Sequence, residues 1–314
     1  MPSPVYLVSG FLDSGKTTLI RETIYDPGFM EGFDRVLLIC FEQGEVEYDN
    51  DFLDEHGVCI EYMDDVNDLT VERMHELDTV YHPDAVFIEW NGTQPITETI
   101  LTGAPDFWPL VQILATVDAS TFQLYIGAMR QMLYEQLRWA DTVIVNRCKP
   151  TDSGSMLRGN IKAINRRAQI YYEGNFGEAV VFKDGFLPFD INADVIDIKD
   201  DDYGLWYMDA MEDPRKYDGK HVILRGMFAE EIPGYKQTII MGRRAMVCCE
   251  ADTSLIGLTV TGVRKDELKI GDWIQVEGNL KTIPFEDHEG ETVVLYATRV
   301  WHYPKPKDEY VTFS

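Results

Sequence analysis

The chain has 314 residues, 45% hydrophobic and 26% charged, so we expect a packed globular protein of one large or two ordinary domains and exclude a disordered chain. Its 54 acidic against 28 basic residues give a formal net charge of −26, which disfavours nucleic acid and anionic membranes as partners. The sequence has no apolar run near the ~20 residues that span a bilayer, no basic signal-peptide start and no disulfide-like framework among its five cysteines, so we expect a cytoplasmic protein.

Residues 4 to about 190 alternate between apolar runs and segments with helical spacing. The runs VYLVSG, RVLLIC, DAVFIEW, VQILATVD, DTVIVN and AVVF are typical of buried parallel strands. TTLIRETIY follows the first run, TFQLYIGAMRQMLYEQLRWA precedes the fifth, and SMLRGNIKAINRRA follows it. This alternation predicts an α/β domain over residues 1–190, with a mostly parallel sheet and helices on both faces.

The first run leads into GFLDSGKT, residues 10–17, which fits the G-x-x-x-x-G-K-[ST] pattern of a phosphate-binding loop. Gly10 and Gly15 allow backbone N–H groups to wrap around phosphate oxygens, and the following helix directs its positive end at the anion. Lys16 adds a positive charge on the β- and γ-phosphates, and Thr17 places a hydroxyl on Mg²⁺. A glycine-rich turn with an incidental lysine is the alternative. Three neighbours complete the predicted nucleotide site: Asp13, Ser14 and Thr18.

A nucleoside triphosphatase also needs an acid beside magnesium, at the end of a second strand. DAVFIEWNG offers Glu89, which closes an apolar run, and Gly92 follows three residues later. A carboxylate there can hold Mg²⁺ through water, while a backbone N–H near Gly92 meets the γ-phosphate. The alternative is a strand-end glutamate that faces solvent. Asp118, at the end of another predicted strand, is a further candidate acid.

The pattern changes after residue 190. Residues 191–218 are acidic and irregular, and we interpret them as a linker. Residues 219–314 hold short alternating runs broken by turn residues, which predict a small all-β domain, either an OB-like barrel or a sandwich. The five runs are HVILRGMFAE, QTIIMGRRAMVCCEA, LIGLTVTGV, DWIQVEGNL and TVVLYATRVW.

Over about residues 4–185 the chain resembles the CobW-type branch of the metal-handling P-loop GTPases. GFLDSGKTTLI is close to that family's G-F-L-G-S-G-K-T-T-L, and its Glu-x-x-Gly matches Glu89 to Gly92. VDA and AINRRAQIYY also have family counterparts. The resemblance implies a P-loop NTPase fold, a catalytic set of Lys16, Glu42 and Glu89, and Glu42 as a further magnesium ligand. FEQGEVEYD is similar to the family's switch segment N-E-F-G-E-x-x-x-D, which carries over Glu42, Gly44, Glu45 and Asp49.

The guanine-reading motif departs from the family pattern. The family has Asn-Lys-x-Asp after a strand, and here DTVIVN is followed by RCKPTD. Asn146 is kept, Arg147 replaces the lysine, and Lys149 stands where the aspartate accepts two hydrogen bonds from guanine. A lysine offers only donors, so Lys149 does not support selection of guanine. Asp152 lies three residues further on and leaves a substitute open.

The family's metal motif G-C-x-C-C also departs, because the chain has GVCIEY. Cys59 keeps the first thiol, while Glu61 and Tyr62 take the other two places. Cys59 and Glu61 can face one way from an extended segment, but two ligands make a poor site for four-coordinate zinc, and Cys59 as a small buried hydrophobic residue is the alternative.

The second half resembles the C-terminal domain of a poorly characterised, permease-associated bacterial family. That domain carries a Cys-Cys-x-Ala-Asp stretch, and a packed strand with one cysteine inside is the alternative to a metal or thiol role here. Three residues match the stretch and are candidate transition-metal ligands: Cys248, Cys249 and Asp252.

Together these features predict a cytoplasmic, magnesium-dependent nucleoside triphosphatase, with GTP as the expected substrate and zinc as a candidate metal. It would act as a switch in metal homeostasis or delivery, with slow turnover because no internal arginine finger can be identified. The expected partners are the nucleotide and a client protein of unknown identity, and a homo-oligomer stays open. A non-catalytic nucleotide-dependent scaffold and a small-molecule kinase are the alternatives.

Overall fold

The computed structural model describes residues 2–42, 48, 50–183, 187–246, 253–265, 267–284 and 290–311. The chain forms two compact units, which are described separately. The first unit contains residues 1–152 and 167–181, and the second contains residues 153–166 and 182–314. The chain therefore passes between the units at three places.

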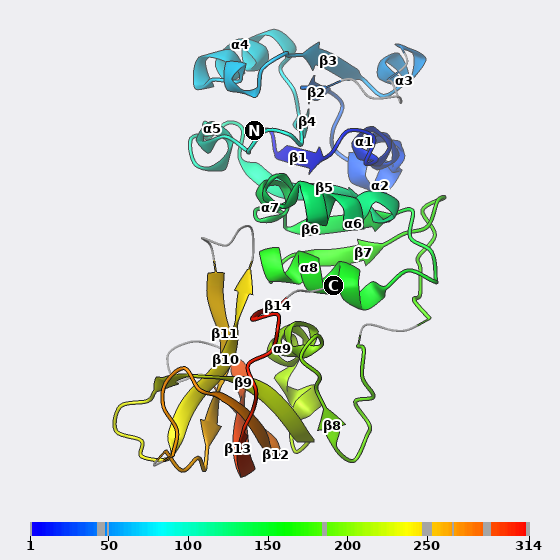
Figure 1. Cartoon of the computed structure of the whole chain (residues 1–314). Coiled ribbons are helices and arrows are strands. Elements are labelled where there is room, and N and C mark those ends of the chain that lie inside the picture. Colours follow the sequence, from blue (N-terminus) through cyan, green and yellow to red (C-terminus); the bar gives the residue numbers. More distant parts are fainter. Residues whose placement is uncertain are drawn as a thin grey trace. The chain divides into compact units, whose positions relative to one another are not determined.

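The first unit is built on a parallel sheet of seven strands, with the order β3-β2-β4-β1-β5-β6-β7 (Figure 1). The predicted fold class is confirmed, because all six neighbouring pairs are parallel and helices flank the sheet. The strands are β1 (Val5–Gly10), β2 (Val36–Cys40), β3 (Val58–Tyr62), β4 (Ala85–Glu89), β5 (Leu110–Asp118), β6 (Thr142–Asn146) and β7 (Gln169–Tyr172).

The central strands are the predicted apolar runs, and every residue of β2 and β4 is buried. The prediction was wrong for AVVF, residues 179–182, which form no strand beyond an isolated bridge at Ala179. The sheet edge is occupied instead by β7, and Val181 is 84% exposed. An edge strand is covered on fewer sides, so β7 has no continuous apolar run to reveal it.

Several helices of the first unit begin at a polar residue whose side chain accepts a backbone N–H of the first turn. Thr70 caps α4 by accepting the backbone N–H of Arg73, and Asp118 caps α6 by accepting that of Ser120. The long helix predicted over residues 121–140 divides at Met129, whose backbone (φ −133°, ψ 33°) is not helical. These helices are α1 (Lys16–Tyr25), α2 (Pro27–Met30), α3 (Asn50–Glu55), α4 (Val71–Tyr81), α5 (Glu98–Leu101), α6 (Ala119–Ala128) and α7 (Arg130–Leu137), with the 3₁₀ helix η1 (Val66–Asp68).

The second unit is built around a five-stranded β-barrel, in agreement with the predicted all-β domain. Its strands follow the order β10-β11-β13-β12-β9, and an additional pairing of β9 with β10 closes the barrel. β11 and β13 run parallel, whereas the other four pairs are antiparallel. This closed arrangement is that of an OB-like barrel. The strands are β9 (His221–Glu231), β10 (Thr238–Met246), β11 (Thr253–Thr261), β12 (Trp273–Pro284) and β13 (Glu291–His302), with short additions β8 (Ile196–Asp197) and β14 (Tyr310–Val311).

The acidic segment 191–218 holds β8, the helix α9 (Tyr203–Glu212) and the 3₁₀ helix η2 (Pro214–Tyr217). Tyr203, Trp206 and Tyr217 are buried in the same apolar cluster as the barrel interior. Burial of three aromatic side chains fixes this segment against the barrel, because aromatic residues contribute large apolar areas.

The helix α8 (Gly154–Ile164) also belongs to the second unit, although it lies between β6 and β7 in the chain. Its Arg158 forms ion pairs with Asp209 and Glu212 of α9, and Lys162 lies 3.1 Å from Glu212. Asp209 is 5% exposed and also accepts the hydroxyl of Tyr217 at 2.6 Å. The two helices are thus joined by a network in which a buried carboxylate has several donors.

No helix in the described part of the chain combines the length and the apolar character needed to cross a membrane.

Candidate functional site

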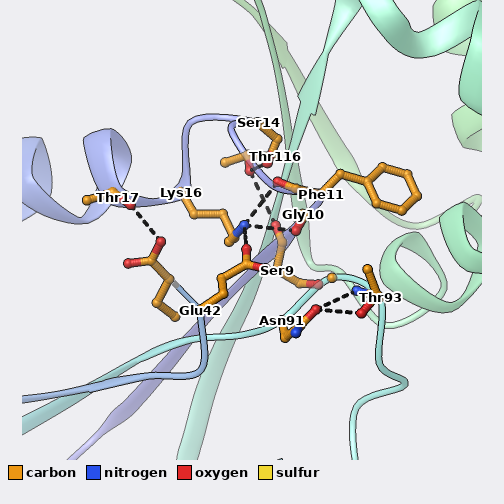
Figure 2. Close-up of polar contacts among 12 residues, drawn as sticks. Ser9, Gly10, Phe11, Ser14, Lys16, Thr17, Glu42, Asn91, Thr93 and Thr116 are labelled. Carbon is orange, nitrogen blue, oxygen red and sulfur yellow. Dashed lines mark hydrogen bonds and ion pairs between the residues drawn. The ribbon is translucent and has the colours of Figure 1, made fainter. Parts of the chain in front are cut away.

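The predicted phosphate loop connects the end of β1 to the start of α1 (Figure 2). Gly15 has φ 99°, a left-handed conformation that favours glycine, and a Cβ there would lie 2.6 Å from Nδ2 of Asn146. The same amide nitrogen donates to the carbonyl of Ser14 at 2.6 Å. The hydroxyl of Ser14 lies 2.7 Å from that of Thr116 on β5. Side chains from β5 and β6 therefore fix the loop from one side.

Lys16 is 3% exposed and stands at the first position of α1. Its ammonium donates to the carbonyls of Gly10 and Phe11, both at 3.0 Å, and forms an ion pair with Glu42 (Figure 2). A buried charge needs such partners, because transfer out of water is costly. Phosphate oxygens are acceptors of the same kind, so they can take the place of these partners around Lys16.

Thr17 and Glu89 lie together, although they are 72 residues apart in the chain. The Thr17 hydroxyl donates to Oε1 of Glu89 at 2.6 Å, and the Tyr48 hydroxyl donates to Oε2 at 2.7 Å. The Cys40 thiol lies 3.9 Å from the same Oε2. Glu89 is 3% exposed, so it does not face solvent. Burial raises the pKa of Glu89, while the hydrogen bonds from Thr17 and Tyr48 act in the opposite direction.

The residues at this position fit a magnesium ion in their chemistry. The hydroxyl of Thr17 and the carboxylate of Glu89 are hard oxygen donors, which Mg²⁺ prefers. Glu42, the third expected ligand, forms an ion pair with Lys16 in this structure. The pKa of the Cys40 thiol is raised, chiefly by burial and then by the charge of Glu89, so Cys40 is a neutral donor here.

Gly92 lies against the start of the phosphate loop. A Cβ at this position would come within 2.0 Å of the Gly10 carbonyl oxygen, so the close approach requires glycine. Asn91 closes the turn by accepting the backbone N–H and the hydroxyl of Thr93 at 2.9 and 2.7 Å (Figure 2). The Glu-x-x-Gly segment is thus brought to the loop at both of its ends.

The segment after β6 holds the loop through Arg147. Its backbone is left-handed (φ 54°), its guanidinium donates to the carbonyl of Asp13 at 3.0 Å, and it forms an ion pair with Asp118. Burial acts to raise the pKa of Asp118, but hydrogen bonds from Ser120 and Arg147 outweigh it and hold the pKa below its usual range. Asp118, considered as a magnesium acid, is therefore a loop anchor in this structure.

Asp152, the candidate substitute for the guanine-reading aspartate, takes part in a local turn. The Asp152 carboxylate accepts the backbone N–H of Lys149 at 2.7 Å, and the Asp152 N–H donates to the Lys149 carbonyl at 2.9 Å. Asp152 thus closes its own turn. Thr18, the last predicted loop residue, is exposed on the first turn of α1.

The candidate transition-metal ligands do not assemble into a site within the described residues. Cys59 is exposed on β3, so its interpretation as a buried hydrophobic residue was wrong. The Glu61 carboxylate forms an ion pair with Arg73 and accepts the Tyr81 hydroxyl at 2.9 Å. Across the described ranges, no group of three or more His, Cys, Asp or Glu side chains is placed to hold a metal. The remaining candidates lie outside the described residues: Gly44, Glu45, Asp49, Cys248, Cys249 and Asp252.

Sequence reasoning missed Tyr48, Cys40 and Thr116, which contact Glu89 or Ser14. Tyr48 lies inside the segment compared with a switch, which is the one signal that could have drawn attention to it. Cys40 and Thr116 look like ordinary strand residues in the sequence.

Two family models match the chain. The nucleotide-binding domain of CobW/HypB/UreG matches residues 4–172, and the DUF1980 C-terminal domain matches residues 186–312. A comparison with curated proteins gave no match.

Solved structures with similarity to the chain include a hydrogenase maturation factor, a GTPase and a single-stranded DNA-binding protein. The hydrogenase maturation factor HypB from Archaeoglobus fulgidus is 18% identical (TM-score 0.41), with 56% of this chain and 84% of that chain covered. The Zn(II)-bound YjiA GTPase from E. coli is 16% identical (TM-score 0.44), with 93% of each chain covered. A small single-stranded DNA-binding protein from Streptomyces coelicolor is 15% identical (TM-score 0.20) and covers 27% of this chain and 94% of that chain. At these identities and scores the similarities say nothing about activity.

Proposed function

The chain belongs to the CobW/HypB/UreG family through its nucleotide-binding domain, and from this premise we propose that it is a magnesium-dependent nucleoside triphosphatase. GTP is the expected substrate, and hydrolysis is expected to be slow without a partner. The proposed role is a switch in metal homeostasis or metal delivery in the cytoplasm, acting on a client protein.

The observation that carries the proposal is the contact between Thr17 and Glu89. It brings the hydroxyl at the start of α1 and the acid at the end of β4 within 2.6 Å, one residue from Lys16. Phosphoryl transfer to water needs a metal-holding hydroxyl, a metal-side acid and a phosphate-binding lysine in one place. An incidental lysine in a glycine-rich turn would not explain why Glu89 is buried there.

In the proposed reaction, Lys16 and the loop N–H groups hold the β- and γ-phosphates, and Thr17 with Glu89 holds Mg²⁺. The bound ion supplies positive charge that offsets the charge developing on the phosphate oxygens. Glu89 would hold the ion, directly or through a water molecule. Glu42 leaves Lys16 when phosphate oxygens replace it, and is then available as a further magnesium ligand.

The proposed switch follows from two contacts within the protein that binding of Mg²⁺ and nucleotide would break. Glu42 is bound to Lys16, and Tyr48 is bound to Glu89. Both residues lie within the segment compared with a switch, near its two ends, and both partners are needed by the magnesium nucleotide. Binding therefore changes the contacts at both ends of that segment, and hydrolysis restores them.

The metal handled by the switch is proposed as cargo and not as a resident cofactor. Zinc suits thiolate ligands, and the described candidates are Cys59, which is exposed on the edge strand β3, and Glu61, which is half-buried on the same strand. Two ligands are insufficient for zinc, so the cargo site would need residues of the client protein or of a second copy of the chain.

Release of inorganic phosphate from GTP tests the proposal. The wild-type chain should release phosphate only with Mg²⁺, and Lys16→Ala should reduce the rate by at least about a hundredfold, or ~2.7 kcal/mol. Lys307→Ala removes an exposed lysine of the second unit and should change nothing. Equal rates for wild type and Lys16→Ala would contradict the proposed triphosphatase activity.

A nucleotide-dependent scaffold without turnover is the second candidate. It is favoured by Lys149, which stands where the family has the guanine-reading aspartate. It predicts magnesium-dependent nucleotide binding that Lys16→Ala abolishes, with no phosphate release above background.

A further inference from the structure

The second unit contains a pocket of about 440 Å³ beside the last part of β13. This volume lies within the range of small-molecule sites. The loop after β11 contributes Gly262, Arg264, Glu267 and Leu268 to the lining, and β13 contributes residues 298–302. Nothing in the proposed triphosphatase reaction uses these residues.

The pocket lies at an open edge of the barrel. β11 pairs with β13 only as far as Thr261 and Tyr296, whereas β13 continues to His302. In the described strands, this last stretch of β13 pairs on one side alone, with β12. An open edge leaves backbone donors and acceptors available to a ligand.

The residues of β13 that line the pocket alternate between the two faces of the strand. Val300 and His302 stand opposite Val276 and Ile274, which are fully buried; Val300 is half-buried against the barrel core, whereas His302 at the end of the strand is exposed. Arg299 and Trp301 alternate with them and stand opposite Glu277 and Gln275 on the outer face. A ligand in the pocket can therefore contact apolar and cationic side chains across one strand edge.

The cationic side chains of the pocket have few acidic partners. Among the described residues, no carboxylate pairs with Arg264, which is exposed. Arg299 lies 3.9 Å from Glu277, and that carboxylate also contacts His221 at 3.0 Å. A guanidinium that no carboxylate neutralises is available to phosphate or carboxylate oxygens of a ligand.

The remaining lining residues indicate a ligand with a planar ring and hydrogen-bond donors. Trp301 is 41% exposed, so its ring can stack on a flat group. Glu267 and Thr298 offer acceptors for amino or hydroxyl groups, which a bare inorganic anion lacks. We propose that this pocket is a second ligand site, which binds a mononucleotide-class molecule through its phosphate and its base.

Calorimetric titration of the full-length chain tests this site. The chain carries Lys16→Ala, so that the phosphate loop does not contribute, and the probes are AMP, GMP and pyrophosphate. We expect one site for AMP or GMP, weaker binding of pyrophosphate, and affinity that falls as salt is raised. Arg264→Ala and Arg299→Ala should each weaken binding about tenfold, which corresponds to ~1.4 kcal/mol.

Two variants guard against a loss of folding. Arg244→Ala removes an exposed arginine from β10 of the same barrel and should leave binding unchanged. Arg299→Lys keeps the charge but not the fork of donors, so it should bind more weakly than wild type and more tightly than Arg299→Ala. Trp301→Ala should weaken AMP binding without changing pyrophosphate binding.

Three outcomes would overturn the proposal. The first is no heat from AMP or GMP up to millimolar concentration. The second is equal binding by wild type and the two arginine-to-alanine variants. The third is binding of an oligothymidylate at least about tenfold tighter than AMP through the same arginines, which would identify a nucleic-acid surface and not a small-molecule site.

Discussion

The two parts of the chain differ most in charge. Residues 1–218 contain 16 Lys or Arg against 40 Asp or Glu, whereas residues 219–314 contain 12 against 14. The net charge of −26 is therefore almost entirely a property of the first part. Polyanions are therefore disfavoured more strongly as partners of residues 1–218 than of residues 219–314, because electrostatic repulsion is screened within about 10 Å.

The candidate sites of the two parts also differ in how deeply their charged groups are buried. At the end of the parallel sheet, Lys16 and Glu89 are each 3% exposed and each held by several protein groups. In the barrel pocket, Arg264 and Arg299 are exposed and weakly paired. Buried groups give a preorganised site for one demanding ligand, while exposed arginines give a weaker, salt-sensitive one. The following predictions test this contrast.

The largest expected effect is on the stability of the second unit. Trp206 is fully buried in its core, so Trp206→Ala should destabilise that unit by about 3–5 kcal/mol. Thermal unfolding should show a lower transition temperature for the barrel. The chain should still bind the magnesium nucleotide at temperatures below that transition. Trp139→Ala, at a site 43% exposed, is the matched control. A single transition that falls together with nucleotide binding would show that the two units do not unfold separately.

The next effect concerns the acid of the first unit. Glu89→Gln keeps the size of the side chain but removes its charge, so magnesium-dependent phosphate release should fall at least about a hundredfold. Because burial raises the pKa of Glu89, wild-type magnesium affinity should be present above that pKa and lost as pH falls through it. Glu89→Gln should show no such pH dependence. Glu98→Gln, at the start of α5, is the control, and unchanged turnover in Glu89→Gln would remove Glu89 from the site.

The third effect concerns base selection. Lys149→Asp restores an acceptor where guanine N–H groups are read, so it should raise the GTP-to-ATP affinity ratio about tenfold or more. Competition titrations of the two triphosphates measure this ratio. A ratio unaffected by the change would mean that the segment after β6 does not contact the base.

A smaller effect concerns the hydroxyl that holds Glu89. Tyr48→Phe removes a donor that must release Glu89 before the metal binds, so half-maximal Mg²⁺ should fall about threefold to tenfold. Titration of Mg²⁺ at fixed nucleotide gives this value. Tyr235→Phe removes the hydroxyl of a tyrosine that is 61% exposed in the second unit and should have no effect, whereas a higher magnesium requirement in Tyr48→Phe would contradict the switch.

The smallest effect has the opposite pH direction to that of Glu89. Hydrogen bonds to Glu277 and Asn279 raise the pKa of His221, so its contribution to barrel stability is full below its unfolded pKa of about 6.5 and is lost as pH rises through the folded value. Because the group is partly exposed, the barrel should lose about 2 °C or less in melting temperature between pH 6 and 8. His221→Gln should abolish the trend, and a rise in melting temperature over that range would contradict it.

Much of the fold could be predicted because central strands are continuous apolar runs. β3 and β7 were not read as such runs, since their burial is mixed: Cys59 and Tyr62 are exposed on β3, and Gln169 and Tyr171 on β7. AVVF satisfied the apolar criterion but forms only an isolated bridge between Ala179 and Glu173. Apolar content thus predicts strands that are covered on both faces better than strands at an edge.

The residues of the candidate site also divide into those that the sequence could predict and those that it could not. Lys16, Thr17 and Glu89 could be predicted because each residue type follows from the chemistry of a magnesium nucleotide. Tyr48 and Cys40 could not, since their contacts join residues 41 and 49 positions away from Glu89. The ion pair between Glu42 and Lys16 could not be predicted either. A sequence motif identifies the ligands of the nucleotide-bound site, and it does not show which protein groups those ligands contact without nucleotide.

The three crossings of the chain between its units have a practical consequence for anyone who wants to separate them. A fragment that stopped at residue 190 would retain α8 but lose α9, and Arg158 and Lys162 would then face water in place of Asp209 and Glu212. A fragment that began at residue 191 would carry the converse defect, an acidic helix without its basic partner. Proteolysis at a single bond would accordingly leave two pieces that remain associated or unfold, and a dissection by genetic truncation would have to transplant the segment 153–166 along with the barrel.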